Sequence, residues 1–242
     1  MSTPDMRLAD AFVALAGTPD DSYDVARHLS VLTGHSVALL GVGAVGAVLR
    51  AGDQGAVRVS ASDPRVTQLE TGAVDRCEGP GHDCCRTGAL PETVLDTAPA
   101  HQRWPHYTPR ALALGYTRVA ALPLTVREET VGALVLLHSR STPLTPVELA
   151  LGRSLATAAA TALVRERELT RSRVLTSQLE LALTSRIVIE QAKGVLANRM
   201  TLSMDQAFDV LRSHARSHRV KLADVALDVV EGRLNIADPH AA

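Results

Sequence analysis

The first half of the chain alternates between helical and strand-like patterns of apolar residues. Residues 6–16 and 24–40 carry apolar side chains every three or four positions, which predicts two helices. From Val45 the pattern becomes one of alternation, and it predicts a hairpin up to residue 62 with its turn around Gly52-Asp53 and Gly55. A second hairpin is predicted over 117–139, with a polar turn at 127–129.

Two segments between these hairpins complete the expected domain. Residues 72–91 are rich in Gly, Pro and Cys, so they are expected to form a loop. Residues 100–114 are expected to form a single helix that carries Trp104 and Tyr107. Helices interspersed with hairpins indicate an α+β domain built on an antiparallel sheet.

A long uninterrupted helix is predicted to follow. Thr145-Pro146 with Glu148 is a helix-start signature, and no Gly or Pro occurs from Arg153 to Lys193. A helix from 146 to about 198 would be about 80 Å long, so we expect it to pair with a second copy in a parallel coiled coil. The expected seam residues are Leu155, Ala159, Ala162, Leu169, Leu175, Leu179 and Ala182.

The C-terminal quarter predicts two further helices. Ser203 and Gln206 have the spacing of a capping box, and Phe208, Leu211 and Ala215 fall on one helical face behind it. After a turn at 219–222, a second apolar stripe runs to Val229 and ends before Gly232. The end of the long helix and these two helices form an all-α module.

Composition narrows the classes of function. The 242 residues include 46% hydrophobic residues, enough for a sizeable core, and 25 Lys and Arg against 26 Asp and Glu. Only six residues are aromatic, which argues against recognition of bases by a stacking platform. The N-terminus lacks the order of a signal peptide, and the longest apolar run has 13 residues, so a cytoplasmic protein without a membrane span is expected.

Three motifs are candidates for chemical sites. Residues 41–46 spell G-x-G-x-x-G, but the pattern changes from helix to hairpin there, which favours a helix cap and a strand start over a dinucleotide site. Cys77, Cys84 and Cys85 are candidates for a redox site, while ordinary loop or core cysteines are favoured and no metal site is assigned. His214 and His218 have zinc-protease spacing without the adjacent Glu, so a polar helix face is favoured. No catalytic residue and no cofactor are expected.

A basic cluster remains. Between residues 186 and 221 there are seven Lys and Arg and three acids. Arg212, Arg216 and Arg219 are spaced to form one stripe on a helix, and Arg186 and Lys193 share a face of the preceding helix. Such a stripe is often only a solvated surface, but two facing helices with basic stripes favour contact with a phosphate backbone.

The same segment resembles the ANTAR domain, an RNA-binding output module of bacterial transcription antitermination regulators. The resemblance rests on S-R-I-V-I-E-Q-A-K-G-V-L (185–196), A-F-D-V-L-R (207–212) and K-L-A-D-V-A (221–226), in the family's order and spacing. It implies a three-helix fold and binding to RNA stem-loops in leader transcripts. The implied RNA-binding residues are Arg186, Lys193, Gly194, Arg199, Arg212, Arg216 and Lys221.

Residues 20–165 more loosely resemble a GAF domain. The matching marks are E-G-P (78–80), R-T-G (86–88), R-W-P (103–105), L-P-L (122–124) and V-G-A-L (131–134). The cysteines depart from the family pattern, so no family role is transferred to them. The resemblance implies a sensor domain that binds a small molecule or dimerises.

Together these observations predict a dimeric sensor-regulator in which a GAF-like domain controls an ANTAR module. The expected parts are a helical extension (1–19), the GAF-like domain (20–150), a coiled-coil linker (151–180), the ANTAR module (181–236) and a tail (237–242). Two alternatives stay open: a redox or metal sensor that uses Cys77, Cys84 and Cys85, and a DNA-binding helix-turn-helix protein.

Overall fold

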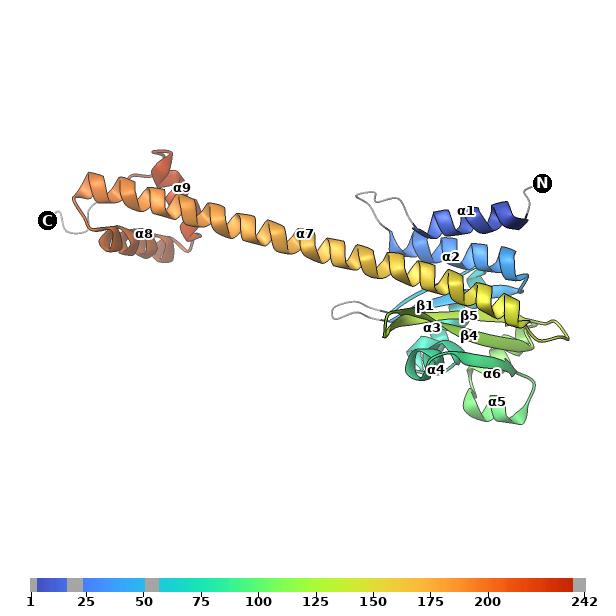
Figure 1. Ribbon diagram of the computed structural model, residues 1–242. Helices are drawn as coiled ribbons and strands as arrows, with labels where there is room; N and C mark the ends of the chain where they lie inside the picture. Colours follow the sequence, from blue (N-terminus) through green and yellow to red (C-terminus); the bar gives the residue numbers. More distant parts are fainter. Residues whose placement is uncertain (1–3, 17–23, 51–56, 237–242) are drawn as a thin grey trace. The chain divides into compact units, whose positions relative to one another are not determined.

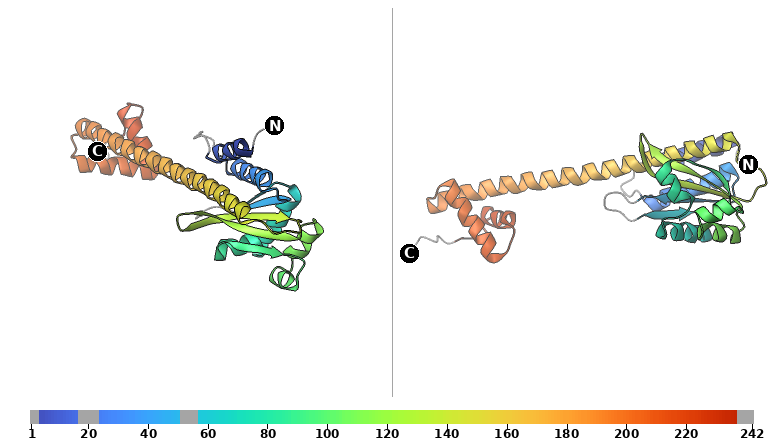
Figure 2. Two further views of the ribbon diagram at one scale, coloured as in Figure 1. Left: turned by 45° about the vertical axis from the view of Figure 1, so that its right-hand side comes forward. Right: turned by 90° about the horizontal axis from the view of Figure 1, so that it is seen from below.

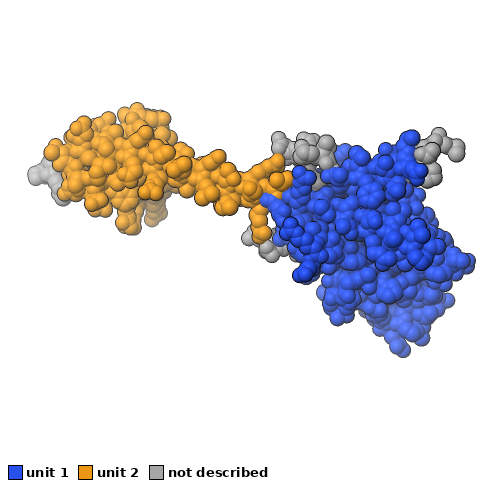
Figure 3. Space-filling view, in the orientation of Figure 1, with its two compact units in different colours: residues 1–168 blue, residues 169–242 orange. Residues whose placement is uncertain are grey.

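The computed structural model describes residues 4–16, 24–50 and 57–236. It divides into two compact units, residues 1–168 and 169–242 (Figure 3). The turn of the first predicted hairpin and the predicted tail lie outside the described residues.

Unit 1 contains one antiparallel sheet of five strands in the order β2-β1-β5-β4-β3. Both predicted hairpins are present: β1 pairs with β2, and β4 pairs with β5 from Arg118↔His138 to Val126↔Glu129. The strands are β1 (Ala44–Leu49), β2 (Arg58–Ala61), β3 (Leu90–Val94), β4 (Arg118–Val126) and β5 (Glu129–His138). The α+β class predicted from the sequence is thus confirmed.

Helices cover both faces of this sheet (Figures 1 and 2). Along β5, Leu134 and Leu136 pack on one face, while Val135 and Leu137 pack on the other, as the two-residue period of a strand requires. The first face carries α1 (Pro4–Ala16), α2 (Val25–Leu40) and the beginning of α7 (Pro146–Met200). The second face carries α3 (Pro64–Asp75), α4 (Pro80–Thr87), α5 (Ala98–Arg103) and α6 (Tyr107–Ala113).

The expected loop over 72–91 is wrong, because this segment contains the end of α3, all of α4 and the start of β3. Pro80 occupies the first turn of α4, where its missing N–H costs nothing. Gly79 precedes it with a φ of 100°, a conformation that favours glycine. Cys84 is fully buried against the sheet, so tertiary packing stabilises a helix whose composition alone disfavours one.

The single helix expected over 100–114 is also wrong, since α5 ends at Arg103 and α6 begins at Tyr107. The break lies at Trp104, which has a non-helical φ of −133° and ψ of 71°. Pro105 explains it, because a proline disfavours the helical conformation of the residue before it.

Helix α7 confirms the predicted long helix, but its first part belongs to the core of unit 1. Thr145 and Glu148 form the expected reciprocal cap at its start. Leu155 and Ala159 are fully buried in the core that α7 shares with α1, α2 and the sheet. These two residues are therefore not available as seam residues of a coiled coil. Gly152 allows the close approach, because a Cβ there would lie 2.7 Å from Leu122 Cδ1.

By length and composition alone, α7 also meets the requirements of a membrane-spanning helix, with a mean hydropathy of 1.3 over 18 residues. The sequence expectation of no such segment rests on uninterrupted apolar runs, whereas polar residues interrupt this Ala-rich stretch. Its buried residues Leu155, Ala156, Ala159 and Ala160 already pack in the core of unit 1. Core packing thus accounts for part of this apolar stretch, of which 33% is buried inside the structure.

Candidate nucleic-acid interface

Unit 2 contains the end of α7 with α8 (Met204–His218) and α9 (Leu222–Val230), packed around one apolar core. The predicted capping box is present at α8: Gln206 N donates to Ser203 Oγ (3.2 Å), and Ser203 N donates to Gln206 Oε1 (2.8 Å). The fully or nearly buried residues are Ala192, Leu196, Ala207, Leu211, Ala215, Val225, Ala226 and Val229. Most residues of the predicted apolar stripes form this interior, whereas Phe208 is half-buried at its edge.

The turn between α8 and α9 ends the basic stripe on α8. Arg219 caps α8 in the left-handed conformation, with a φ of 55°. Arg219 therefore does not continue the stripe on one helical face that the sequence predicts for Arg212, Arg216 and Arg219. Lys221 is the N-cap residue of α9 and is exposed.

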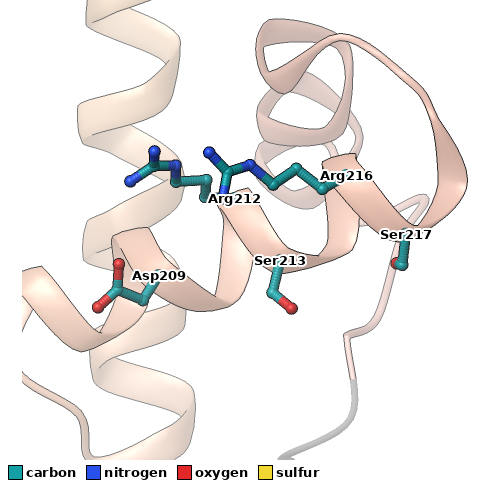
Figure 4. Close-up of a pocket in the computed structure, with 5 residues that line it drawn as sticks. All are labelled: Asp209, Arg212, Ser213, Arg216 and Ser217. Atoms are coloured by element: carbon teal, nitrogen blue, oxygen red, sulfur yellow. The ribbon is translucent and has the colours of Figure 1, made fainter.

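Arg212 and Arg216 line a shallow hollow of about 460 Å³ on the exposed face of α8. In Figure 4 their two guanidinium groups lie on the same side of the helix. The remaining lining residues are Asp209, Ser213 and Ser217. These three were not predicted as site residues, although their i, i+4, i+8 spacing places them on one stripe beside the arginines.

The predicted basic residues of α7 do not share one face. Arg186 and Lys193 are seven residues apart and do share one, whereas Arg199 lies about 120° around the helix from Lys193. Arg186 and Arg199 are exposed. The seven predicted residues therefore divide between several surfaces of the module.

Lys193 differs from these arginines, because its charge is already engaged. Its Nζ lies 2.9 Å from both carboxylate oxygens of Glu190 and 5.8 Å from the centre of the Phe208 ring. Its side chain is only 14% exposed. Lys193 thus links α7 to α8, and only the remaining exposed part of it can meet a ligand.

Gly194 stands next to Lys193 and is exposed. A Cβ added there would meet nothing within 4 Å, and its backbone is not left-handed. A glycine inside a helix costs about 1 kcal/mol relative to alanine. Nothing within the described chain requires this glycine, in contrast to Gly152 in the same helix.

His214 and His218 stack on α8 with ring centres 4.1 Å apart. His218 Nδ1 lies 3.0 Å from the His214 carbonyl oxygen and 2.9 Å from Ser217 Oγ. Burial, and then the neighbouring His218, lower the pKa of His214. Among the described residues, no group of three His, Cys, Asp or Glu side chains is placed to hold a metal ion.

The cysteines of unit 1 lie in two different environments. Cys77 is exposed in the turn after α3, with a φ of 53°, whereas Cys84 and Cys85 lie in α4. Burial raises the pKa of the Cys84 thiol to about 12 and also raises that of Cys85. Both thiols are thereby kept protonated, which disfavours the thiolate that redox chemistry and metal binding need.

The residues that suggested a sensor domain have structural roles on the second face of the sheet. The Glu78 carboxylate accepts hydrogen bonds from the backbone N–H groups of His106 and Tyr107, both at 2.7 Å, and so caps α6. Asp83 accepts from Arg103 Nε (2.7 Å) and from Trp104 Nε1 (3.1 Å). These bonds tie α4 and the preceding turn to α5 and α6.

Glu70 is a buried carboxyl group on the same face. Its Oε1 accepts a hydrogen bond from the Tyr107 hydroxyl at 2.8 Å. Gly46 provides the space, since a Cβ there would lie 2.8 Å from Glu70 Cγ. Burial raises the pKa of Glu70 to about 7, although the bond from Tyr107 acts in the opposite direction. Sequence patterns gave no signal for this residue, because its burial arises from tertiary packing.

The glycine motif at 41–46 serves the fold, as expected. Gly41 caps α2 in the left-handed conformation with a φ of 59°, and β1 begins at Ala44. The motif itself runs into β1, which lies between β2 and β5, and not into a helix. A dinucleotide site needs a helix N-terminus directly after these glycines, so the described residues do not form one here.

Comparison with known proteins agrees with the two units. The sequence profile of the GAF domain family matches residues 13–164, and that of the ANTAR domain family matches residues 177–230. No curated protein matches the sequence significantly.

Solved structures of GAF domains resemble unit 1. One is the GAF domain of an Acinetobacter phosphoenolpyruvate-protein phosphotransferase, with 12% identity, a TM-score of 0.50, and coverage of 69% of this chain and 97% of that one. Another is the GAF domain of the corresponding protein from Coxiella burnetii, with 17% identity, a TM-score of 0.51, and coverage of 69% and 96%. At such identities the likeness concerns the fold alone.

A sensor-type GAF domain followed by an ANTAR domain defines a regulatory protein. The chain belongs to the GAF domain family and carries a C-terminal ANTAR domain, so it is a GAF–ANTAR regulator.

Proposed function

We propose that this protein is a cytoplasmic antitermination regulator that binds stem-loops in leader transcripts through its ANTAR domain. The hollow on α8 carries this proposal: two exposed arginines lie on one side of a helix in a domain that matches the ANTAR family. The GAF domain would receive the signal, such as a small molecule.

The side chains of the hollow suit RNA. Guanidinium groups bind phosphate oxygens in bidentate fashion and also stack on unpaired bases. Ser213 and Ser217 add hydroxyl groups that can donate or accept hydrogen bonds. The scarcity of aromatic residues in this unit favours such contacts over a stacking platform, since Phe208 is its single aromatic residue.

Gly194 supports an external partner on α7. Glycine destabilises the helix at this position, although the described chain leaves room there for a larger side chain. We infer that an RNA backbone approaches α7 at this point, next to the exposed part of Lys193.

Dimerisation is the second part of the proposal. Four of the expected seam residues are exposed in unit 2, namely Leu169, Leu175, Leu179 and Ala182. Leu183 is exposed as well. A second copy that covered these leucines would bring two ANTAR domains together. Paired modules would bind two linked stem-loops more tightly than one, because the second contact becomes intramolecular.

The decisive experiment replaces both arginines of the hollow. Arg212→Ala with Arg216→Ala is expected to weaken binding by about tenfold or more near 0.1 M salt, and to reduce the slope of log K against log salt by about 2. The RNA is selected on the wild-type protein from a library of paired stem-loops with randomised loops. Lys193→Ala, measured in parallel, should weaken binding as well.

The control is Arg153→Ala, which removes one exposed charge outside the ANTAR domain and should leave the affinity unchanged. Unchanged affinity in the double arginine variant would refute the site. Duplex DNA is added as a competitor at the same salt, and preference for it would support the helix-turn-helix alternative instead.

A further inference from the structure

The segment that joins β5 to α7 is tied to strand β3 by one carboxylate. Glu92 Oε2 accepts a hydrogen bond from Leu144 N at 2.6 Å, two residues before α7 begins. Glu92 Oε1 accepts from Arg118 Nη1 of β4 at 2.9 Å. Glu92 is largely buried, so these bonds are shielded from water.

Two arginines fasten the same segment at other points. Arg118 Nη2 donates to the Ser141 carbonyl at 3.3 Å. Arg140 donates to Glu148 Oε1 at 2.7 Å and to the Leu40 carbonyl at 2.9 Å, which links the segment to α7 and to the end of α2. The start of α7 is therefore positioned by charged groups and not by apolar packing alone.

His138 lies next to this network without taking part in its hydrogen bonds. It pairs with Arg118 in the β4–β5 register, and its side chain is 1% exposed. Its Nε2 is 3.4 Å from Glu92 Oε1, and neither ring nitrogen has a hydrogen-bond partner among the described residues. The buried imidazole thus faces the Glu92 carboxylate at ion-pair distance but completes no hydrogen bond, which is unusual for a buried ring.

The charged groups that face His138 are Glu92 on β3, Arg118 on β4 and Arg140 after β5. Burial lowers the pKa of His138 most, the two arginines lower it further, and Glu92 raises it. The ring is therefore neutral near pH 7, and protonation would place a third cation beside the Glu92–Arg118 pair and close to Arg140, whose own carboxylate partner is Glu148.

We propose that Glu92, Arg118 and His138 form a proton-sensitive clamp on the start of α7. With His138 neutral, Glu92 holds Arg118 and the Leu144 N–H. An imidazolium at His138 competes for Glu92 and repels both arginines, so the 139–145 segment is released. The clamp acts on the helix that leads into the output domain, so its role in regulation rests on the proposed function. Its opening, however, is measurable without RNA.

The direction of the pH effect follows from linkage. The closed clamp binds a proton on His138 less readily than the open clamp, in which the ring meets water and regains its ordinary pKa of about 6.5. Closure is therefore fully stable above about pH 6.5 and weakens as the pH falls through and below that value.

Amide hydrogen exchange of the full chain tests this directly. In wild type, protection of peptides covering 140–148, corrected for intrinsic exchange, should fall about threefold or more between about pH 7.5 and about pH 5.5. His138→Gln should show equal protection at both pH values. Glu92→Gln should show reduced protection at both, because the charge-assisted bond to Leu144 is weakened.

His28 provides the matched control. It is also buried with a lowered pKa, and its Nε2 lies 3.2 Å from the Ala159 carbonyl of α7, far along the helix from Leu144. His28→Gln should leave the pH dependence at 140–148 intact. Should His138→Gln fold poorly, the NMR titration of the His138 ring in wild type must give the same midpoint as the exchange transition.

A wild type without pH dependence at 140–148, or a His138→Gln variant that keeps it, would overturn the clamp. Because no RNA enters these measurements, that result leaves the proposed function untouched. Conversely, failure of the arginine variants to affect RNA binding would leave the clamp standing.

Discussion

Glu70 shows how a single residue sets the pH response of the GAF unit. Its carboxyl group lies in an apolar core, and among the described residues its recorded hydrogen bond is the one from Tyr107. Since its pKa is raised to about 7, the folded chain binds a proton there at pH values where the unfolded chain has lost it. The contribution of this group to the free energy of unfolding should therefore fall as the pH rises from about 4.5 to about 7, by about 3 kcal/mol.

Glu70→Gln should remove this contribution. Glutamine still accepts the Tyr107 hydrogen bond but cannot ionise, so the variant should be more stable than wild type above pH 7, by about 1–3 kcal/mol. Urea unfolding at a series of pH values measures the effect. Glu128→Gln in the exposed β4–β5 turn is the control and should keep the wild-type slope; an unchanged slope in Glu70→Gln would contradict the assignment.

At the scale of helices and strands, the sequence predicts the elements that local signals determine and misses those that depend on tertiary packing. The hairpins, α2, α7, α8 and α9 could be predicted, because their periodicity and capping residues act over a few positions. Ser203 with Gln206, and Thr145 with Glu148, form the caps that their spacing indicates. The missed helix α4 has a comparable signal in Pro80, but cysteines and glycines of weak helical propensity masked it.

For the candidate site, the sequence likewise predicts what depends on spacing along one helix and not what depends on contacts between elements. The spacing of Arg212 and Arg216 placed them together, as Figure 4 shows. The partnering of Lys193 by Glu190 and Phe208 depends on how α8 packs against α7, and spacing along one helix cannot reveal it. The same holds for Glu92 and His138, which are brought together by strand pairing across β4.

The cap of α8 is expected to matter for that helix alone. Ser203→Ala removes the acceptor for Gln206 N and should cost about 1 kcal/mol. Amide protection across α8 should then fall about fivefold in the full chain. Ser213→Ala, on the exposed face of the same helix, should leave protection unchanged or slightly raised. Equal behaviour of the two variants would show that the cap contributes nothing.

At the scale of the whole molecule, the proposed dimer depends on the leucines of α7 in unit 2. Leu175, Leu179 and Leu183 are each more than half exposed and follow one another at four-residue intervals. They lie within about 80° of one another around the helix. An exposed leucine stripe of this kind is expected to bury itself against a second copy.

Replacing Leu175, Leu179 and Leu183 with Gln should convert the dimer to monomer at micromolar concentration in sedimentation equilibrium. The affinity for linked stem-loops should fall with it, while the affinity for a single stem-loop changes little. Leu181→Gln is the control, since Leu181 is equally exposed but lies about 160° from Leu179. A wild type that sediments as a monomer would exclude this arrangement.

Trp104, the single tryptophan of the chain, is buried on the second face of the sheet and donates to Asp83. Its fluorescence therefore reports on the environment of the GAF unit, and the ANTAR unit has no tryptophan to contribute. Far-ultraviolet circular dichroism, in contrast, records the helices of both units. The chain thus carries its own optical means of observing sensor and output separately, without an added label.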